Sequence, residues 1–152
     1  MNMRRLKVLA IAVATGRIGY VYLIGDRLRD WGLSRRTSIN PTLAAAQTEK
    51  WIADLAPDLV VTEKVSKTST KSFKTKTLIE AIQRVAANAN LLDVCVSRAS
   101  IFKNKYEEAR HLGERFPEIT AWVPKPRRIW EPEPKNTVLF EALGMGVSVL
   151  EE

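Results

Sequence analysis

Apolar residues at the start of the chain fall into short blocks separated by turn residues. The first block, residues 6–14, is too short for a buried helix and ends at a Thr-Gly pair, which indicates a central strand. Residues 18–24 and 27–33 form two further strand-like blocks, joined by a Gly-Asp pair suited to a tight hairpin turn. Three strands joined by two short turns predict an antiparallel meander.

The next part of the chain alternates between helical and strand patterns. Apolar residues at helical spacing follow Asn40, whose side chain can cap a helix. Residues 58–63 are nearly all apolar and end in Glu63, as is typical of a buried parallel strand reached by a crossover helix. A second helix is predicted over residues 77–89 and a fifth strand over residues 91–97.

The last third of the chain predicts two more helices. One begins at Asn104 and ends at Pro117, and the other covers residues 136 to about 150. A loop rich in proline and charge, residues 124–135, separates them. The pattern as a whole predicts a mixed α/β fold, and we expect residues 1–152 to form a single domain.

The charge balance adds a candidate partner. The chain carries 24 Lys and Arg residues against 17 Asp and Glu residues, a net charge of +7, which favours a polyanion such as nucleic acid. A single cysteine, Cys95, excludes a disulfide framework within the chain and fits a reducing cytoplasm. It lies in an apolar run, so we expect it to be buried. We also expect a cytoplasmic protein with no membrane partner, because no apolar run approaches the length of a membrane span and no signal peptide is recognisable.

Two segments are candidates for binding nucleic acid. Residues 64–76 form a predicted polar loop in which every charge is positive, and residues 124–135 bring two arginines close to Trp130. Lysines, arginines and hydroxyls suit phosphate oxygens, and an exposed aromatic ring can stack on an unpaired base with a gain of ~1–3 kcal/mol. The alternative is a solvated linker with Phe73 packed on the second helix. The candidate DNA-binding residues are Lys67, Lys71, Phe73, Lys74, Lys76, Arg127 and Arg128.

Two stretches of the chain carry a family resemblance. Residues 8–20 combine an apolar strand, a Gly-containing turn and a Gly-Tyr step into the next strand. Near the end of the chain, Arg-Phe-Pro-Glu at 115–118 and Phe-Glu-Ala at 140–142 match the tails of uncharacterised bacterial RuvC-like proteins. The chain thus resembles the RuvC-type junction resolvases of the RNase H-like superfamily. Where the resemblance places the first catalytic Asp, the chain has Ala12.

The resemblance implies an RNase H-like α/β fold with a five-stranded mixed sheet in the order 3-2-1-4-5. It also implies a metal-dependent endonuclease that cuts branched DNA, such as a Holliday junction, in recombination and repair, and that works as a homodimer. Such enzymes hold two Mg²⁺ ions, or Mn²⁺, between carboxylates. The catalytic positions would be Ala12, Glu63, Glu133 and Glu141, of which Glu63, Glu133 and Glu141 could ligate metal.

Several alternatives remain open at this point. Glu63 is either a ligand or a solvated carboxylate paired with Lys64 or Lys67, and Glu133 is either a ligand or surface charge beside the arginines. Resolvases place two acidic residues one turn apart on the last helix, whereas Thr137 and Val138 precede Glu141 here.

Ala12 itself has three explanations. It is an engineered inactivation, a natural feature of a degenerate nuclease that only binds DNA, or a sign that the chain has no metal site. With Ala12 the nuclease is expected to be inactive or nearly so. The alternative functions are a non-catalytic nucleic-acid-binding module and a nuclease acting on RNA or hybrids.

Overall fold

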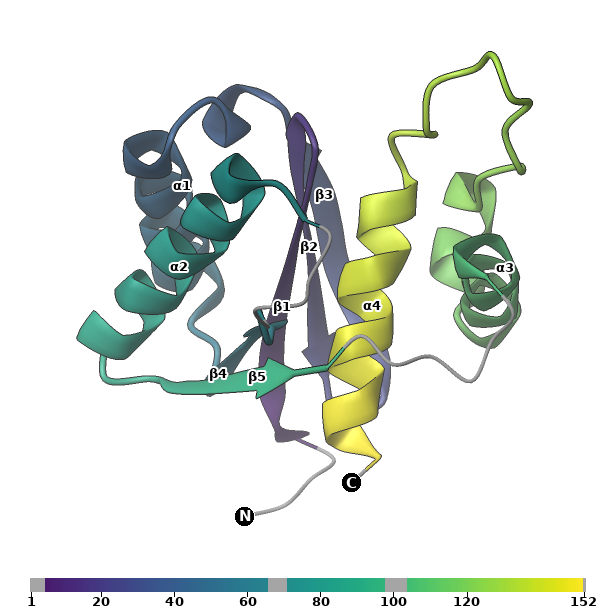
Figure 1. Cartoon of the computed structure of the whole chain (residues 1–152). Coiled ribbons are helices and arrows are strands. Elements are labelled where there is room, and N and C mark those ends of the chain that lie inside the picture. The colour runs from purple at the N-terminus through teal and green to yellow at the C-terminus, as the bar shows by residue number, and fades with distance from the viewer. Residues whose placement is uncertain (1–4, 66–70, 98–103, 152) are drawn as a thin grey trace.

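Five strands form one mixed sheet in the order β3-β2-β1-β4-β5 in the computed structural model, which describes residues 5–65, 71–97 and 104–151 (Figure 1). The antiparallel meander consists of β1 (Lys7–Ala14), β2 (Arg17–Ile24) and β3 (Arg27–Ser34). The parallel part adds β4 (Leu59–Glu63) beside β1 and β5 (Leu92–Val96) beside β4. The predicted mixed sheet and its order 3-2-1-4-5 are confirmed.

Helices cover both faces of the sheet, and each layer has its own buried apolar cluster (Figure 1). One face carries α1 (Pro41–Leu55) and α2 (Phe73–Asn88), and the other carries α4 (Thr137–Leu150). Outside α4 lies α3 (Lys105–Arg115). Two 3-10 segments complete the chain, η2 (Arg36–Ser38) and η3 (Pro117–Trp122).

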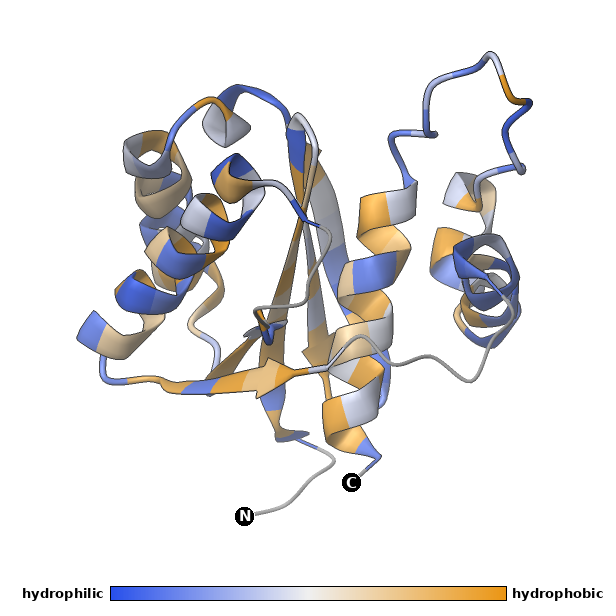
Figure 2. Ribbon diagram, in the orientation of Figure 1, coloured by the Kyte–Doolittle hydropathy of each residue, from blue (hydrophilic) through white to orange (hydrophobic). Residues whose placement is uncertain are grey.

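Most residues of α4 are apolar and buried, and Figure 2 shows apolar residues along the side of the helix that faces the viewer. An amphipathic helix needs only one apolar stripe, but α4 packs on β1 and β2 on one side and on α3 on another. Its only charged residue is Glu141, which is half-buried. In the described part of the chain no helix is long and apolar enough to cross a membrane.

Side-chain caps place the helices where the sequence predicts them. The Asn40 side chain accepts a hydrogen bond from the Leu43 amide at 2.9 Å, and the Asn104 side chain accepts one from the Glu107 amide at 3.0 Å. Trp51 of α1 is buried, as its position on the apolar stripe indicates.

Two expectations from the sequence were wrong. The second helix begins at Phe73 rather than Thr77, because the Ser72 hydroxyl accepts a hydrogen bond from the Thr75 amide at 3.2 Å and caps the helix one turn earlier. Phe73 therefore starts a helix instead of lying in a loop. Cys95 is exposed rather than buried, because β5 forms the edge of the sheet and is only partly covered.

Candidate functional site

Ala12 and Glu63 lie on the same face of the sheet, at the carboxyl ends of β1 and β4. The parallel register pairs Ala10 with Val61, and both residues belong to the cluster under α4. Side chains alternate along a strand, so Ala12 and Glu63, each two residues further on, face the same side of the sheet just beyond the last paired positions. Ala12 is 4% exposed and the Glu63 side chain is 13% exposed. We call this part of the molecule the strand-end site.

The first turns of α4 cover the strand-end site. Gly19 of β2 pairs with Ala12, and a Cβ at position 19 would lie only 3.1 Å from Val138 Cγ1. Glu141 follows Val138 by three residues and is therefore on a neighbouring part of the helix surface. A side chain at position 19 would therefore be crowded by the backbone and side chain of Val138, so α4 packs closely on β2 here.

Lys71 places a positive charge in the strand-end site. Its Nζ lies 3.5 Å from Glu63 Oε2 and donates a hydrogen bond to the Val13 carbonyl oxygen at 3.2 Å. The Lys71 side chain is 26% exposed, so the ammonium is directed into the protein. The ion pair that the structure shows for Glu63 is with Lys71, a partner that the sequence did not indicate, and ligation of metal by Glu63 stays a prediction. Lys67 is outside the described residues.

Glu133 lies beside the turn between β1 and β2, where two cations hold it. It forms ion pairs with Lys105 of α3 and with Arg17 of β2, the latter at 3.5 Å. Arg17 is paired with Ala14 in the sheet, two residues beyond Ala12. Glu133 is thus near the strand-end site, but its carboxylate is neutralised by Arg17 and Lys105.

The residues present do not form a metal site of the kind that the resemblance implies. A site for two divalent ions needs several converging oxygen ligands. Position 12 offers only a methyl group, and the carboxylates of Glu63 and Glu133 face ammonium or guanidinium groups. Throughout the described ranges, no three His, Cys, Asp or Glu side chains are grouped closely enough to bind a metal ion. Metal ligation by Glu63, Glu133 and Glu141 remains a prediction.

A polar network fastens the other face of β4 to α2. Gln83 Nε2 donates to Thr62 Oγ1 at 3.1 Å and to the Glu63 carbonyl oxygen at 3.2 Å. Thr62 Oγ1 in turn donates to Asp93 of β5 at 3.2 Å. Burial raises the pKa of Asp93, and hydrogen bonds from Thr62 and Cys95 offset part of this effect.

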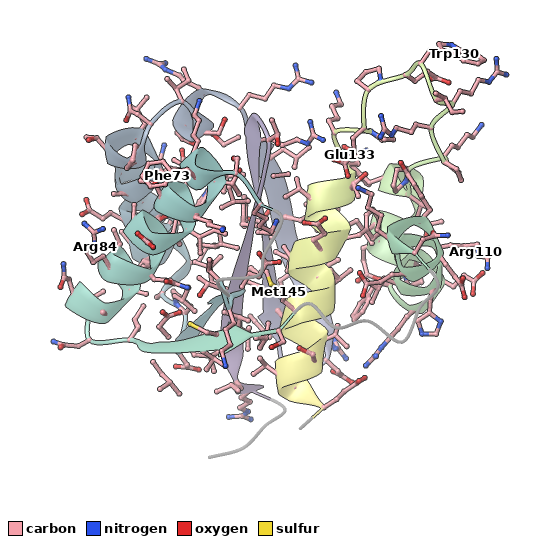
Figure 3. All side chains as sticks on the ribbon, in the orientation of Figure 1. Phe73, Arg84, Arg110, Trp130, Glu133 and Met145 are labelled. Carbon is pink, nitrogen blue, oxygen red and sulfur yellow. The ribbon has the colours of Figure 1, made fainter. Side chains whose placement is uncertain are left out.

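An exposed aromatic ring stands on one side of the strand-end site. Phe73 is 85% exposed at the first residue of α2, two residues after Lys71 (Figure 3). The alternative in which it packs on the second helix is wrong. Lys74 beside it is exposed and Lys76 is partly exposed, so both could reach a polyanion.

A second exposed aromatic stands on the other side, in the loop before α4 (Figure 3). Trp130 is 77% exposed at the loop tip, and the Arg128 guanidinium lies 5.6 Å from the centre of its ring. Arg127 donates to the Glu131 carbonyl oxygen at 2.9 Å, which holds the tip in a turn. Neighbouring Ile129 is 97% exposed. The tip therefore presents apolar and cationic groups together to solvent.

Between the loop and β2 lies an open cavity of about 460 Å³ whose lining is mainly basic. Its charged residues are Arg17, Arg35, Lys125, Arg127, Lys135, Glu131 and Glu133. Arg127 was predicted from the sequence, whereas Arg17 and Arg35 of the lining, and Lys105 beside Glu133, were not. These residues come from separate segments, and no local pattern indicates that the fold brings them together.

No protein-family model matches the chain, and no curated protein matches its sequence. Solved structures match its fold over nearly the whole length. RuvC from Thermus thermophilus in complex with a Holliday junction substrate has a TM-score of 0.61 at 12% identity, covering 94% of this chain and 91% of that chain. The fowlpox virus resolvase with Holliday junction DNA has a TM-score of 0.63 at 13% identity, covering 96% and 97%.

The yeast mitochondrial Holliday junction resolvase has a TM-score of 0.61 at 10% identity, covering 96% of this chain and 78% of that chain. At such low identities the likeness establishes the fold alone. The chain has the RuvC-type, RNase H-like fold that the residues 8–20 and 140–142 led us to expect.

Proposed function

We propose that this protein binds branched DNA across the end of the sheet where β1 and β4 terminate. The observation that carries the proposal is the pair of exposed aromatics, Phe73 and Trp130, on either side of that end, with basic side chains next to each. A junction offers closely spaced phosphates and, at the branch point, bases whose stacking is interrupted and on which an aromatic ring can stack once the branch opens. The resolvases of the same fold that were solved with Holliday junction DNA support this choice of ligand.

We propose that the protein, with alanine at position 12, binds DNA without cutting it. Ala12 supplies no carboxylate. The carboxylates of Glu63 and Glu133 are already paired with lysine and arginine side chains of the chain itself. We also propose that a metal site built at the strand ends would make the protein a structure-selective endodeoxyribonuclease, a proposal that the resolvases of the same fold support. We further propose a single domain that acts as a homodimer, since two-fold symmetry fits the symmetric arms of a junction.

Binding should be measured with a four-way junction and a linear duplex of equal length, in EDTA and in Mg²⁺, at several salt concentrations. We expect tighter binding to the junction, no need for Mg²⁺, and an affinity that falls with salt as counterions are released. Equal affinity for the two DNAs at every salt concentration would contradict the proposal. Sedimentation of the protein–junction complex gives the number of protomers bound.

A second candidate function follows from the fold, namely cleavage or binding of RNA or RNA–DNA hybrids. The same exposed rings and lysines can stack on unpaired RNA bases. Hybrid and single-stranded RNA probes in the same titration distinguish the two candidates, because a hybrid-binding protein would prefer them to the junction.

A further inference from the structure

The cation in the strand-end site comes from the chain itself. Lys71 Nζ lies 3.5 Å from Glu63 Oε2 and 3.2 Å from the Val13 carbonyl oxygen. One acceptor belongs to β4 and the other to β1, so the ammonium joins the carboxyl ends of two adjacent strands. Carboxylate and carbonyl oxygens are also what a hard divalent cation prefers.

Lys71 and Glu63 already form an ion pair at the ends of the two strands. Ala12 adds no negative charge, so a metal ion placed between positions 12 and 63 would meet one carboxylate, and that carboxylate is already paired. A Mg²⁺ or Mn²⁺ ion would carry one more positive charge than Glu63 offsets. It would also have to separate the Lys71 ammonium from Glu63, and breaking a largely covered ion pair is unfavourable.

We propose that Lys71 is the resident cation of the strand-end site and takes the place that a divalent metal would need. Glu133 shows the same principle a short distance away, because Arg17 and Lys105 neutralise it. Lys71 can occupy the strand-end site whichever nucleic acid the protein binds.

The proposal separates two changes that a metal site needs. Replacing Ala12 by Asp adds a second carboxylate, and removing the Lys71 charge opens the position between Glu63 and Val13. Ala12→Asp alone still leaves Lys71 in competition with the metal. The double variant Ala12→Asp/Lys71→Met should therefore bind Mn²⁺ at least about tenfold more tightly than Ala12→Asp alone.

The test measures Mn²⁺ binding by calorimetry and the melting temperature in EDTA and in Mn²⁺ at matched ionic strength. The unmodified protein should show no Mn²⁺-specific rise in melting temperature. Lys71→Met should melt at a lower temperature in EDTA and recover part of the loss in Mn²⁺, which then compensates Glu63. Lys64→Met is the matched control, since Lys64 is an exposed lysine next to Glu63, and it should behave like the unmodified protein.

Equal Mn²⁺ affinity with and without Lys71, both in the unmodified protein and in the Ala12→Asp variant, would overturn the proposal. If the Lys71 variants do not fold, crystals of the unmodified protein soaked in Mn²⁺ decide the matter. An anomalous peak next to Glu63 would overturn the proposal, and its absence with the Lys71 ammonium seen at Glu63 would support it.

Discussion

Gly19 of β2 lies directly beneath Val138 of α4, so close that a Cβ at position 19 would come within 3.1 Å of the valine side chain and 3.2 Å of its backbone. Gly19→Ala should therefore push α4 away from the sheet, at a cost of about 1–3 kcal/mol. For a chain of this size we expect a fall in melting temperature of about 2–4 °C for each kcal/mol. Adding Val138→Ala should restore only part of the loss, because the backbone contact remains. Unchanged melting of Gly19→Ala would show that α4 can move without cost.

Rebuilding the first carboxylate should restore nuclease chemistry. Ala12→Asp places an acid beside Glu63 at the strand ends. Because Lys71 still competes with the metal, we expect weak Mg²⁺- or Mn²⁺-dependent cleavage of branched DNA, which Lys71→Met should increase. Glu63→Gln in that background should return cleavage to the level without metal. Absence of cleavage on junction, duplex and hybrid substrates, also in the double variant with Lys71→Met, would remove the main support for a nuclease ancestry.

The arginines of the loop before α4 should act through phosphates. Arg127→Gln with Arg128→Gln should weaken binding to junction and duplex alike and lower the salt slope by about 0.9 for each phosphate that is no longer neutralised. Arg84→Gln is the control, since Arg84 is exposed on the outer side of α2 (Figure 3). A salt slope that stays the same in the double variant would mean that the loop does not touch the DNA backbone.

The exposed rings should act through bases instead. Phe73→Ala and Trp130→Ala should each cost ~1–3 kcal/mol of binding free energy on the junction, less on the duplex, and leave the salt slope nearly unchanged. Neither should lower the melting temperature, because both rings are solvated. Leu92→Ala is a matched control, since Leu92 is 65% exposed and pairs with Leu59 at the opposite end of β4 from Glu63.

Asp93 should make the stability depend on pH. Burial raises its pKa in the folded protein, so the folded state holds the proton more tightly than the unfolded state does. Stability is then lost as pH rises from the unfolded value of about 3.9 through the raised folded value. Asp93→Asn should melt higher at neutral pH, with an advantage that disappears in acid. Asp54→Asn, on the exposed side of α1, is the matched surface substitution.

The order of strands and helices follows from the sequence because local patterns encode it. The apolar blocks, the caps at Asn40 and Asn104 and the parallel strand ending in Glu63 are all recognisable within a few residues. The start of α2 was misplaced because Ser72 caps a helix whose first turn carries few apolar residues. The lysines and threonines of that first turn show no apolar periodicity, so the start of the helix is not recognisable there.

The site was predicted less completely, for a physical reason. Glu63 and Ala12 were recognisable as strand ends, but the choice of partner among several lysines depends on how the chain leaves β4 and enters α2. Lys71 is eight residues from Glu63 in the sequence, and its ammonium contacts both Glu63 and the Val13 carbonyl oxygen at the end of β1. Arg17 and Lys105 meet Glu133 from elements more than a hundred and about thirty residues away along the chain, respectively. Such contacts leave no periodicity in the sequence.

The hydrogen bonds of Gln83 to Thr62 and to the Glu63 carbonyl fasten the middle of α2 to the end of β4. Phe73 is ten residues away on the same helix, a distance of about 15 Å along its axis. The helix between them is also anchored, because Leu78 and Ile79 are buried in the core. Phe73 is therefore held at a fixed distance from the end of β4, and a base that stacks on the ring meets a surface whose position is set by the core and not by the base.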